Sequence, residues 1–454
     1  MTLKSINPVN GELLKEYNEH SSETIDKCID TAHVCYERWR ETSFTCRADL
    51  LQRCADNLIS YHREYARLIS KEMGKPISES IAEIEKCAWT CRYYAEKGAL
   101  FLSTELVETD ASHSSIHYEP LGVILAVMPW NFPFWQVFRF AAPAIMAGNT
   151  VLLKHASNVS GCALALEEVF RHADAPKGLF TTLLIAADKV AEVIAHSDVK
   201  AITLTGSEKA GAAVAAQAGK LIKKTVMELG GSDPFIVLED ADLKIAAETA
   251  VKARFINNGQ SCIAAKRFIV HKAVVNEFTG LVANEVRKLV IGDPMDDKTS
   301  LGPLARVDLA ETVLSQIQKS IDNGACLLMG GTIGEQGKAF VKPTLLLNVK
   351  KGMPVYDEEV FGPVLPIIEA DSDEECISVA NDTVYGLGAS IWSQDIERAQ
   401  KIAAKIESGS VFINGMVKSD PRLPFGGIKL SGYGRELSEV GIREFVNIKS
   451  IWIK

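Results

Sequence analysis

Two short apolar runs decide the fold: LGVILAV at residues 121–127 and TVLL at residues 150–153. Each has the length and near-continuous apolar character of a strand buried on both faces of a parallel sheet. Similar runs follow at residues 182–185 and 201–204, and segments with helical character occupy residues 161–172, 190–196 and 210–218. Strands that alternate with helices in this way indicate a doubly wound sheet of the dinucleotide-binding type.

The same alternation returns in the second half of the chain. Its expected strands lie at residues 235–238, 267–270, 364–368 and 410–413. Its expected helices lie at residues 242–256, 273–289, 308–322, 374–381 and 395–405. Residues 21–105 read as mostly helical, and residues 445–454 alternate apolar and polar side chains like a β arm. An exposed arm strand tends to pair with a neighbouring chain, so the arm points to an oligomer.

Composition and charge exclude several classes of protein. The 454 residues include 49 Lys and Arg against 58 Asp and Glu, a net charge of −9, which argues against a nucleic-acid-binding surface. No apolar run is long enough to cross a membrane, and residues 1–8 lack the apolar core of a signal peptide. The 10 cysteines form no CxxC pair, so we expect no zinc ribbon and no metal, and free thiols suit a reducing cytoplasm.

Three side chains have the chemistry and the setting of an active site. Cys262 follows the loop-forming residues 257–261, where free backbone N–H groups would lower the thiol pKa and form an oxyanion site. Glu228 ends an expected strand before two glycines, where a buried carboxylate can serve as a general base. Asn131 lies between two prolines that would hold its amide toward an oxyanion. Alone, each has a plainer interpretation: a structural cysteine, a surface glutamate and a turn-capping asparagine.

A possible phosphate site lies at residues 206–211, GSEKAG, between an expected strand and an expected helix. A helix N-terminus in this position binds pyrophosphate well. The spacing differs from GxGxxG, so the segment by itself is weak evidence.

Taken together, seven motifs in order resemble the aldehyde dehydrogenase superfamily over essentially the whole chain. They are PWNFP (129–133), the strand end at Lys154, TGSxxxG (205–211), ELGG (228–231), GQSC (259–262), EEVFGP (358–363) and PFGGxKxSGYGRE (424–436). The resemblance implies an α/β fold with two doubly wound Rossmann-like domains and a small β arm for oligomerisation. It divides the chain into a dinucleotide-binding domain (1–107 and 119–229), a catalytic domain (230–420) and the arm (108–118 and 432–454).

The resemblance also implies a role for each matching residue. Cys262 is the nucleophile, Asn131 and the Cys262 N–H bind the oxyanion, and Glu228 activates the water that hydrolyses the thioester. The residues expected to bind the cofactor are Trp130, Lys154, Ser157, Gly206, Ser207, Leu229, Glu359 and Phe361.

Three segments are similar to one bacterial succinate-semialdehyde dehydrogenase group: residues 154–158, 228–235 and 412–420. Arg139 matches a residue that binds the substrate's distal carboxylate there, although a structural salt bridge is the alternative. Some members have a second arginine at the position of Ile256, so Ser261 and Ser419 are expected to complete the pocket here. The expected reaction is oxidation of succinate semialdehyde to succinate; another ω-carboxylated aldehyde such as glutarate semialdehyde, or an aliphatic aldehyde, would make similar contacts.

Ser157 bears on the choice of cofactor. Many NAD-preferring relatives have a glutamate at this position, which would repel a 2′-phosphate, whereas Ser157 can donate to one and Lys154 adds positive charge. The sequence therefore predicts that NADP is preferred and NAD is also accepted. The expected partners are a small aldehyde and further copies of the chain, as a homodimer or homotetramer, with neither nucleic acid nor membrane.

The same residues argue against three other functions. A CoA-acylating dehydrogenase generally lacks the glutamate that Glu228 matches. A non-catalytic structural relative is at odds with intact Cys262, Glu228 and Asn131. A cysteine protease would need a histidine near Cys262, and no motif places one there.

Overall fold

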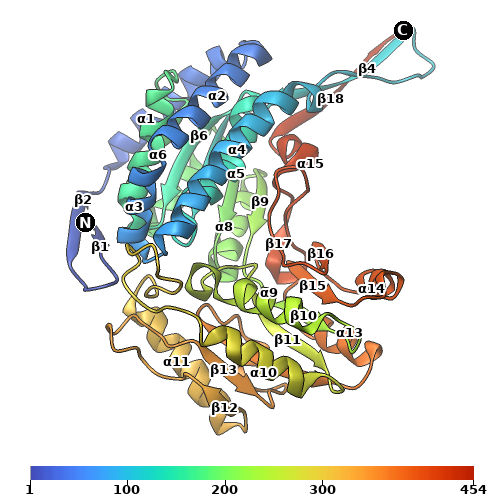
Figure 1. Ribbon diagram of the computed structural model, residues 1–454. Coiled ribbons are helices and arrows are strands. Elements are labelled where there is room, and N and C mark those ends of the chain that lie inside the picture. The colour runs from blue at the N-terminus through green and yellow to red at the C-terminus, as the bar shows by residue number, and fades with distance from the viewer. Residues whose placement is uncertain (1) are drawn as a thin grey trace.

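The computed structural model describes residues 2–454, so Met1, at the start of the predicted cofactor domain, lies outside the described residues. Two helix-covered sheets lie one above the other, and a narrow arm with the C-terminus at its end projects from the upper unit (Figure 1). The N-terminus lies on the opposite side of that unit.

The upper sheet has the strand order β17-β9-β8-β5-β6-β7. Its strands are β5 (Val123–Met128), β6 (Thr150–His155), β7 (Phe180–Thr182), β8 (Val199–Thr205), β9 (Lys224–Glu228) and β17 (Gly432–Tyr433). All pairs are parallel except β17 with β9. The strand order reverses between β5 and β8, and ligands bind at such a switch point in open α/β sheets.

Helices cover both faces of this sheet because side chains alternate along its strands. Val123 and Leu125 pack with α1 (Ser22–Trp39), α7 (Val190–Ala195) and α8 (Glu208–Lys220). Ile124 and Ala126 face the other layer. The helices of that layer are α2 (Phe44–Ser60), α3 (His62–Met73), α4 (Ile77–Phe101), α5 (Trp135–Ala147) and α6 (Ser160–His172).

The lower sheet repeats this plan with the order β12-β13-β14-β11-β10-β15-β16. Its strands are β10 (Asp233–Val237), β11 (Ala265–His271), β12 (Cys326–Met329), β13 (Thr344–Leu347), β14 (Val364–Ala370), β15 (Gly388–Trp392) and β16 (Ser410–Ile413). One face is covered by α9 (Leu243–Phe255) and α10 (Val275–Val286). The other is covered by α11 (Val307–Asp322), α12 (Pro354–Asp357), α13 (Asp373–Asn381) and α14 (Ile396–Ala403). Two doubly wound sheets confirm the predicted fold class.

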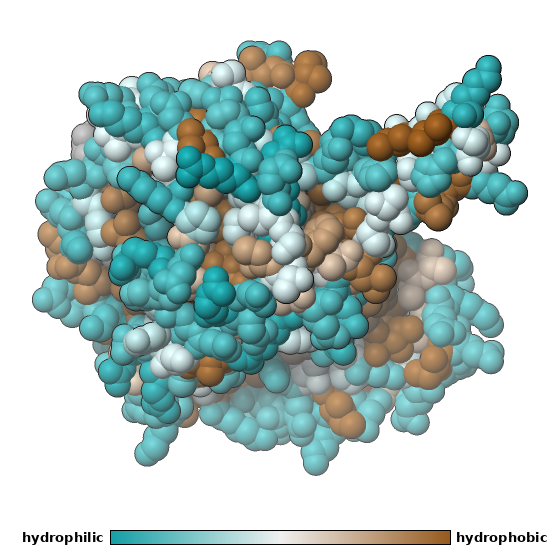
Figure 2. Space-filling model, turned by 90° about the horizontal axis from the view of Figure 1, so that it is seen from above, coloured by the Kyte–Doolittle hydropathy of each residue, from teal (hydrophilic) through white to brown (hydrophobic). Residues whose placement is uncertain are grey.

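The arm is an antiparallel sheet of β3 (Glu105–Leu106), β4 (His113–Pro120) and β18 (Val446–Ile453). Apolar side chains gather along its projecting surface (Figure 2). Ile448, Trp452 and Ile453 are each more than half exposed, so the arm presents apolar surface that the chain itself does not cover.

The structure differs from the sequence-based expectations in four places. The strand expected at residues 182–185 ends at Thr182, where β7 stops. Residues 432–433 form β17 on the upper sheet, and α15 (Ser438–Arg443) packs on α4 and α5, so the arm strand begins only at Val446. The hairpin of β1 (Thr2–Ile6) and β2 (Leu13–Asn18) was not expected, because its largely exposed strands have little apolar signal. Strands β12, β13 and β15 were also not expected.

Within residues 2–454, no helix combines the length and the apolar character that a membrane span requires. Short 3₁₀ segments complete the fold: η1 (Ser157–Val159), η2 (Ala187–Lys189), η3 (Ile256–Gly259) and η4 (Lys429–Ser431).

Asn149 is expected to be a main stabilising residue of the upper unit. Its fully buried amide accepts the Gly122 N–H and donates to the carbonyls of Ala144 and Phe445, which joins the start of β5, the end of α5 and the root of the arm. Asn149→Ala leaves these groups unpaired and should lower the free energy of unfolding by about 1–3 kcal/mol in urea denaturation. The exposed Asn323→Ala is the control, and equal effects of the two changes would contradict this role.

Candidate active site

The predicted motifs meet at the carboxyl-terminal edge of the upper sheet. Asn131 follows β5, Lys154 lies at the end of β6, Ser207 follows β8 and Glu228 ends β9. Parallel strands end at the same edge, so four segments that are distant in sequence reach one crevice.

The loop before Cys262 has an unusual backbone. Asn257, Asn258 and Gly259 have φ values of 53°, 59° and 78°, all in the left-handed region. The Asn257 amide donates to the carbonyls of Asn131 (2.6 Å) and Gln260 (3.1 Å). A Cβ on Gly259 would lie 2.4 Å from the Gly362 carbonyl, so only glycine fits there. The GQSC and EEVFGP motifs therefore pack directly against each other.

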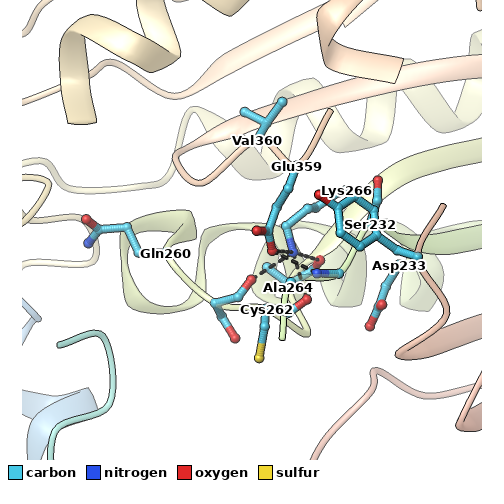
Figure 3. Close-up of polar contacts among 12 residues, drawn as sticks. Ser232, Asp233, Gln260, Cys262, Ala264, Lys266, Glu359 and Val360 are labelled. Carbon is cyan, nitrogen blue, oxygen red and sulfur yellow. Dashed lines mark hydrogen bonds and ion pairs between the residues drawn. The ribbon is translucent and has the colours of Figure 1, made fainter. Parts of the chain in front are cut away.

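Lys266 on β11 fixes the other side of this loop (Figure 3). Its ammonium donates to the carbonyls of Ser261 (2.8 Å), Cys262 (2.8 Å) and Ala264 (3.2 Å), and Glu359 Oε1 lies 3.6 Å from it. Sequence reasoning missed this residue, although a lysine inside an apolar strand four residues after the cysteine is a visible signal. Lys266 holds the turn that presents Cys262.

A cavity of about 290 Å³ opens beside Cys262. Of the predicted site residues, Cys262, Arg139, Ser261 and Ser419 line it, and so does Ile256, the position of the missing second arginine. The remaining wall includes Glu79, Glu83, Lys86, Lys252, Phe132, Trp135, Lys418 and Phe425. Asn131 and Glu228 do not line this cavity. The Ser261 hydroxyl is buried without a partner among the described residues.

Asn131 is held against the Cys262 loop. Its amide nitrogen donates to the Gln260 carbonyl (3.0 Å), and its oxygen accepts from Gln136 (3.0 Å). These two bonds fix the buried Asn131 amide against Gln260, which lies two residues before Cys262. The amide hydrogen bond to Gln260 must be exchanged or shared if Asn131 is to contact an oxyanion.

Arg139 on α5 forms a buried ion pair with Glu436. Its guanidinium also donates to Thr205 (3.3 Å) and lies 4.5 Å from the centre of the Phe425 ring. Of the two roles that the sequence left open for Arg139, the structure therefore shows the salt bridge. Glu436 was missed because its partner lies almost 300 residues away in the chain.

Burial sets the protonation of the two groups expected to react. Desolvation raises the pKa of the Cys262 thiol to about 12, and the positive charges of Arg139 and Lys266 oppose the rise. The expected lowering of this thiol pKa by backbone N–H groups is therefore wrong for the protein without ligands. Burial also raises the pKa of Glu228 well above its usual range, against the charge of Arg139, and Glu228 Oε1 has no partner among the described residues.

The remaining predicted residues frame a second, adjoining region. Ser207 caps α8 by accepting the Ala210 N–H (3.3 Å), immediately after Gly206. The ring of Trp130 lies edge-on to that of Phe361, with 5.9 Å between centres. Glu359 accepts the Gly231 N–H (2.9 Å), and Leu229 packs on Gly211 of α8.

Lys154 is the clearest sign of a ligand in this region. Its buried ammonium has no hydrogen-bond partner among the described residues, and burial lowers its pKa. Ser157 begins η1 three residues later and is only partly covered. An unpartnered buried cation beside a free hydroxyl fits an anionic nucleotide, because such a ligand would supply the missing partner.

Comparisons with known proteins agree with this geometry. Residues 1–451 match the model of the aldehyde dehydrogenase family. A probable succinate-semialdehyde dehydrogenase [NADP(+)] from Synechocystis sp. is 51% identical over 100% of both chains. The succinate semialdehyde dehydrogenase [NAD(P)+] Sad from Escherichia coli is 45% identical over 99% of this chain and 97% of its own. The solved structure of the Streptococcus pyogenes succinic semialdehyde dehydrogenase with NADP+ superposes with a TM-score of 0.97, at 41% identity and 99% coverage of both chains.

The raised thiol pKa can be tested by alkylation of the ligand-free protein. Because the thiolate is the reacting form, the rate of iodoacetamide addition to Cys262 should still rise about tenfold per pH unit up to roughly pH 10. Mass spectrometry of the Cys262 peptide gives the rate, and the exposed Cys46 and Cys326 monitor the reagent in the same sample. A rate that levels off between pH 9 and 10 would show that the thiol pKa is not raised.

Proposed function

Because the chain belongs to the aldehyde dehydrogenase family, we propose that it oxidises succinate semialdehyde to succinate, with NADP preferred over NAD. The printed activities of its full-length relatives support this substrate and this cofactor. The observation that carries the proposal is the small cavity that joins Cys262 to Arg139, Ser261 and Ser419. Its volume of about 290 Å³ suits a short aldehyde, and its wall combines apolar surface with polar groups.

Cys262 is the proposed nucleophile. The thiol proton passes to solvent water, the sulfur adds to the aldehyde carbon, and the electron pair of the C=O π bond moves to oxygen, which gives a thiohemiacetal whose oxygen is negative. The Cys262 N–H and the Asn131 amide are the proposed donors to that oxygen, and each such donor typically contributes about 3–4 kcal/mol. Lys266 keeps the Cys262 turn in place by binding three of its carbonyls.

Glu228 is the proposed general base for the second half of the reaction. Cys262 then holds the acyl group as a thioester, which water must hydrolyse. A carboxylate with a raised pKa is a stronger proton acceptor, and the unpartnered Oε1 of Glu228 is available to take a proton from that water.

The proposed cofactor site consists of the second region of the crevice. The nicotinamide cofactor supplies the hydride acceptor for the oxidation. Lys154 and Ser157 would hold its adenosine ribose and 2′-phosphate, and Ser207 with the Gly206 turn would contact the pyrophosphate. Glu359 would hold the nicotinamide ribose, with Trp130, Phe361 and Leu229 packed around it.

The two α/β units and the arm also have proposed roles. The upper sheet and its helices form the cofactor domain, and the lower sheet forms the catalytic domain. The exposed apolar face of β18 supports assembly into a homodimer or homotetramer through the arm. The ten free cysteines support a reducing cytoplasmic location.

A kinetic panel tests the proposed reaction. Values of kcat/KM should be measured for succinate semialdehyde, glutarate semialdehyde and butanal with each cofactor, from the absorbance of the reduced nicotinamide. Succinate semialdehyde with NADP should give the highest value, and Cys262→Ala should abolish turnover. A higher value for glutarate semialdehyde would assign the longer substrate, and equal values for butanal would contradict an ω-carboxylated substrate.

Ser157→Glu should shift the cofactor preference toward NAD. The new carboxylate would accept from a ribose hydroxyl but repel a 2′-phosphate, and losing a charge-assisted bond changes affinity by roughly 10–100-fold. The ratio of kcat/KM for NADP to that for NAD should fall by about this factor. Ser197→Glu adds the same charge at an exposed position after α7 and should leave the ratio unchanged. An unchanged ratio in Ser157→Glu would remove Ser157 from the cofactor site.

A further inference from the structure

One face of α4 forms part of the substrate cavity through Glu79, Glu83 and Lys86. Two of these charges are engaged in holding loops. Glu79 accepts the Asn257 N–H (2.7 Å), beside the nucleophile loop. Glu83 accepts the N–H groups of Phe134 (2.8 Å) and Trp135 (3.0 Å) and forms a buried ion pair with Lys75. Lys86 lies one turn further along the helix, and its side chain forms no hydrogen bond to a backbone group among the described residues.

Lys86 is a half-buried cation without an anionic partner. Its ammonium donates to the Ser419 hydroxyl (2.8 Å) and lies 4.2 Å from the centre of the Trp135 ring. Within residues 2–454, no carboxylate forms an ion pair with it. An ammonium has three N–H donors, so Lys86 retains donor capacity in a cavity that opens on Cys262.

Half-buried Lys86 differs in this respect from the buried cations of the described chain. The buried lysines and arginines with hydrogen-bond or ion-pair partners use carboxylates or backbone carbonyls, and they are Arg47, Lys75, Arg139, Arg254, Lys266 and Arg267. Lys154 is the other exception, and it faces the proposed site of an anionic cofactor. A desolvated, unpaired charge is unfavourable unless an anion binds to it.

We propose that Lys86 and Ser419 bind the distal carboxylate of the aldehyde substrate, and that Lys86 is the residue that determines specificity for ω-carboxylated aldehydes. This assignment rests on the proposed aldehyde oxidation at Cys262. Lys86 supplies the positive charge that a second arginine would provide at the position of Ile256. Ser419 contributes its hydroxyl, which the Lys86 ammonium already orients.

Arg139 is less suited to this task despite lining the same cavity. Glu436 already neutralises its charge, and Thr205 and the Phe425 ring occupy other parts of the guanidinium. A substrate carboxylate beside Arg139 would also meet the negative charge of Glu436. The carboxylate therefore gains more from Lys86, where no competing anion is paired.

Substrate binding through Lys86 should depend on pH. Desolvation, followed by the charge of Arg139 on α5, lowers the pKa of Lys86 to about 8 in the free protein. Glu83 and Cys87 on α4 and Asp420 after Ser419 act in the opposite direction. Lys86 is therefore charged below pH 8 and loses its proton above it. Binding of a carboxylated aldehyde should weaken as the pH passes about 8, and binding of an uncharged aldehyde should not show this change.

Lys86→Met tests the assignment, because methionine keeps a long side chain and removes the charge. We expect kcat/KM for succinate semialdehyde to fall by about 10–100-fold, and kcat/KM for butanal to change by less than about 3-fold. Succinate, used as a competitive inhibitor, should lose affinity by a similar factor. Lys86→Arg should restore most of the discrimination. Lys97→Met removes a charge from the same helix, outside the cavity, and serves as the control; its side chain is 42% exposed.

Two results would overturn the proposal: equal losses on both aldehydes in Lys86→Met, which mark a structural role, or no loss on either. If the variant does not fold, the wild-type pH profiles decide, since identical profiles for the two aldehydes near pH 8 exclude Lys86. Failure of the proposed function is a separate outcome. It would appear as wild-type oxidation of butanal without oxidation of succinate semialdehyde.

Discussion

The position of Cys262 depends on three consecutive residues in left-handed backbone conformation. Each non-glycine residue in this region costs about 1–3 kcal/mol, so Asn257 and Asn258 need compensating contacts. The Asn258 amide donates to the carbonyls of Gly74 and Pro303, and its oxygen accepts the Gly302 N–H. These partners come from both halves of the chain, so the nucleophile loop forms only where the two α/β units meet.

Helix α4 connects the Cys262 loop to the substrate cavity. Glu79 holds the nucleophile loop and Glu83 holds the loop that follows β5, although both residues lie on one helix of the upper unit. Their spacing of four residues places them on one face, one turn apart. The distance between Cys262 and the Asn131 loop is therefore set by this helix together with the direct hydrogen bonds between the two loops. Lys86 lies on the same face of α4, so the helix also fixes its position relative to Cys262.

The sequence was informative where structure is local. The runs at residues 121–127 and 150–153 identified β5 and β6, and the glycine-containing motifs placed Glu228 at a strand end, Ser207 at a helix start and Cys262 in a loop. Residues that are buried by contacts with distant parts of the chain could not be identified from the sequence. Charges on a helix look like a solvated face, so Glu83 and Lys86 gave no signal until α5 and residues 416–419 covered them. The thiol pKa was mistaken for the same reason: turn geometry is local, whereas desolvation is a property of the assembled site.

The buried charges of the crevice fall into two groups with different physical consequences. Arg139 with Glu436 and Lys75 with Glu83 are internally neutralised, so they hold segments together and offer little to an incoming ligand. Lys86 and Lys154 are not neutralised, and desolvation lowers the pKa of both. Desolvating these two cations, one buried and one half-buried, is unfavourable, and a bound anion would offset that cost. On the proposed assignments, a chain with a net charge of −9 would attract two anionic ligands through two local unpaired cations and not through its overall charge.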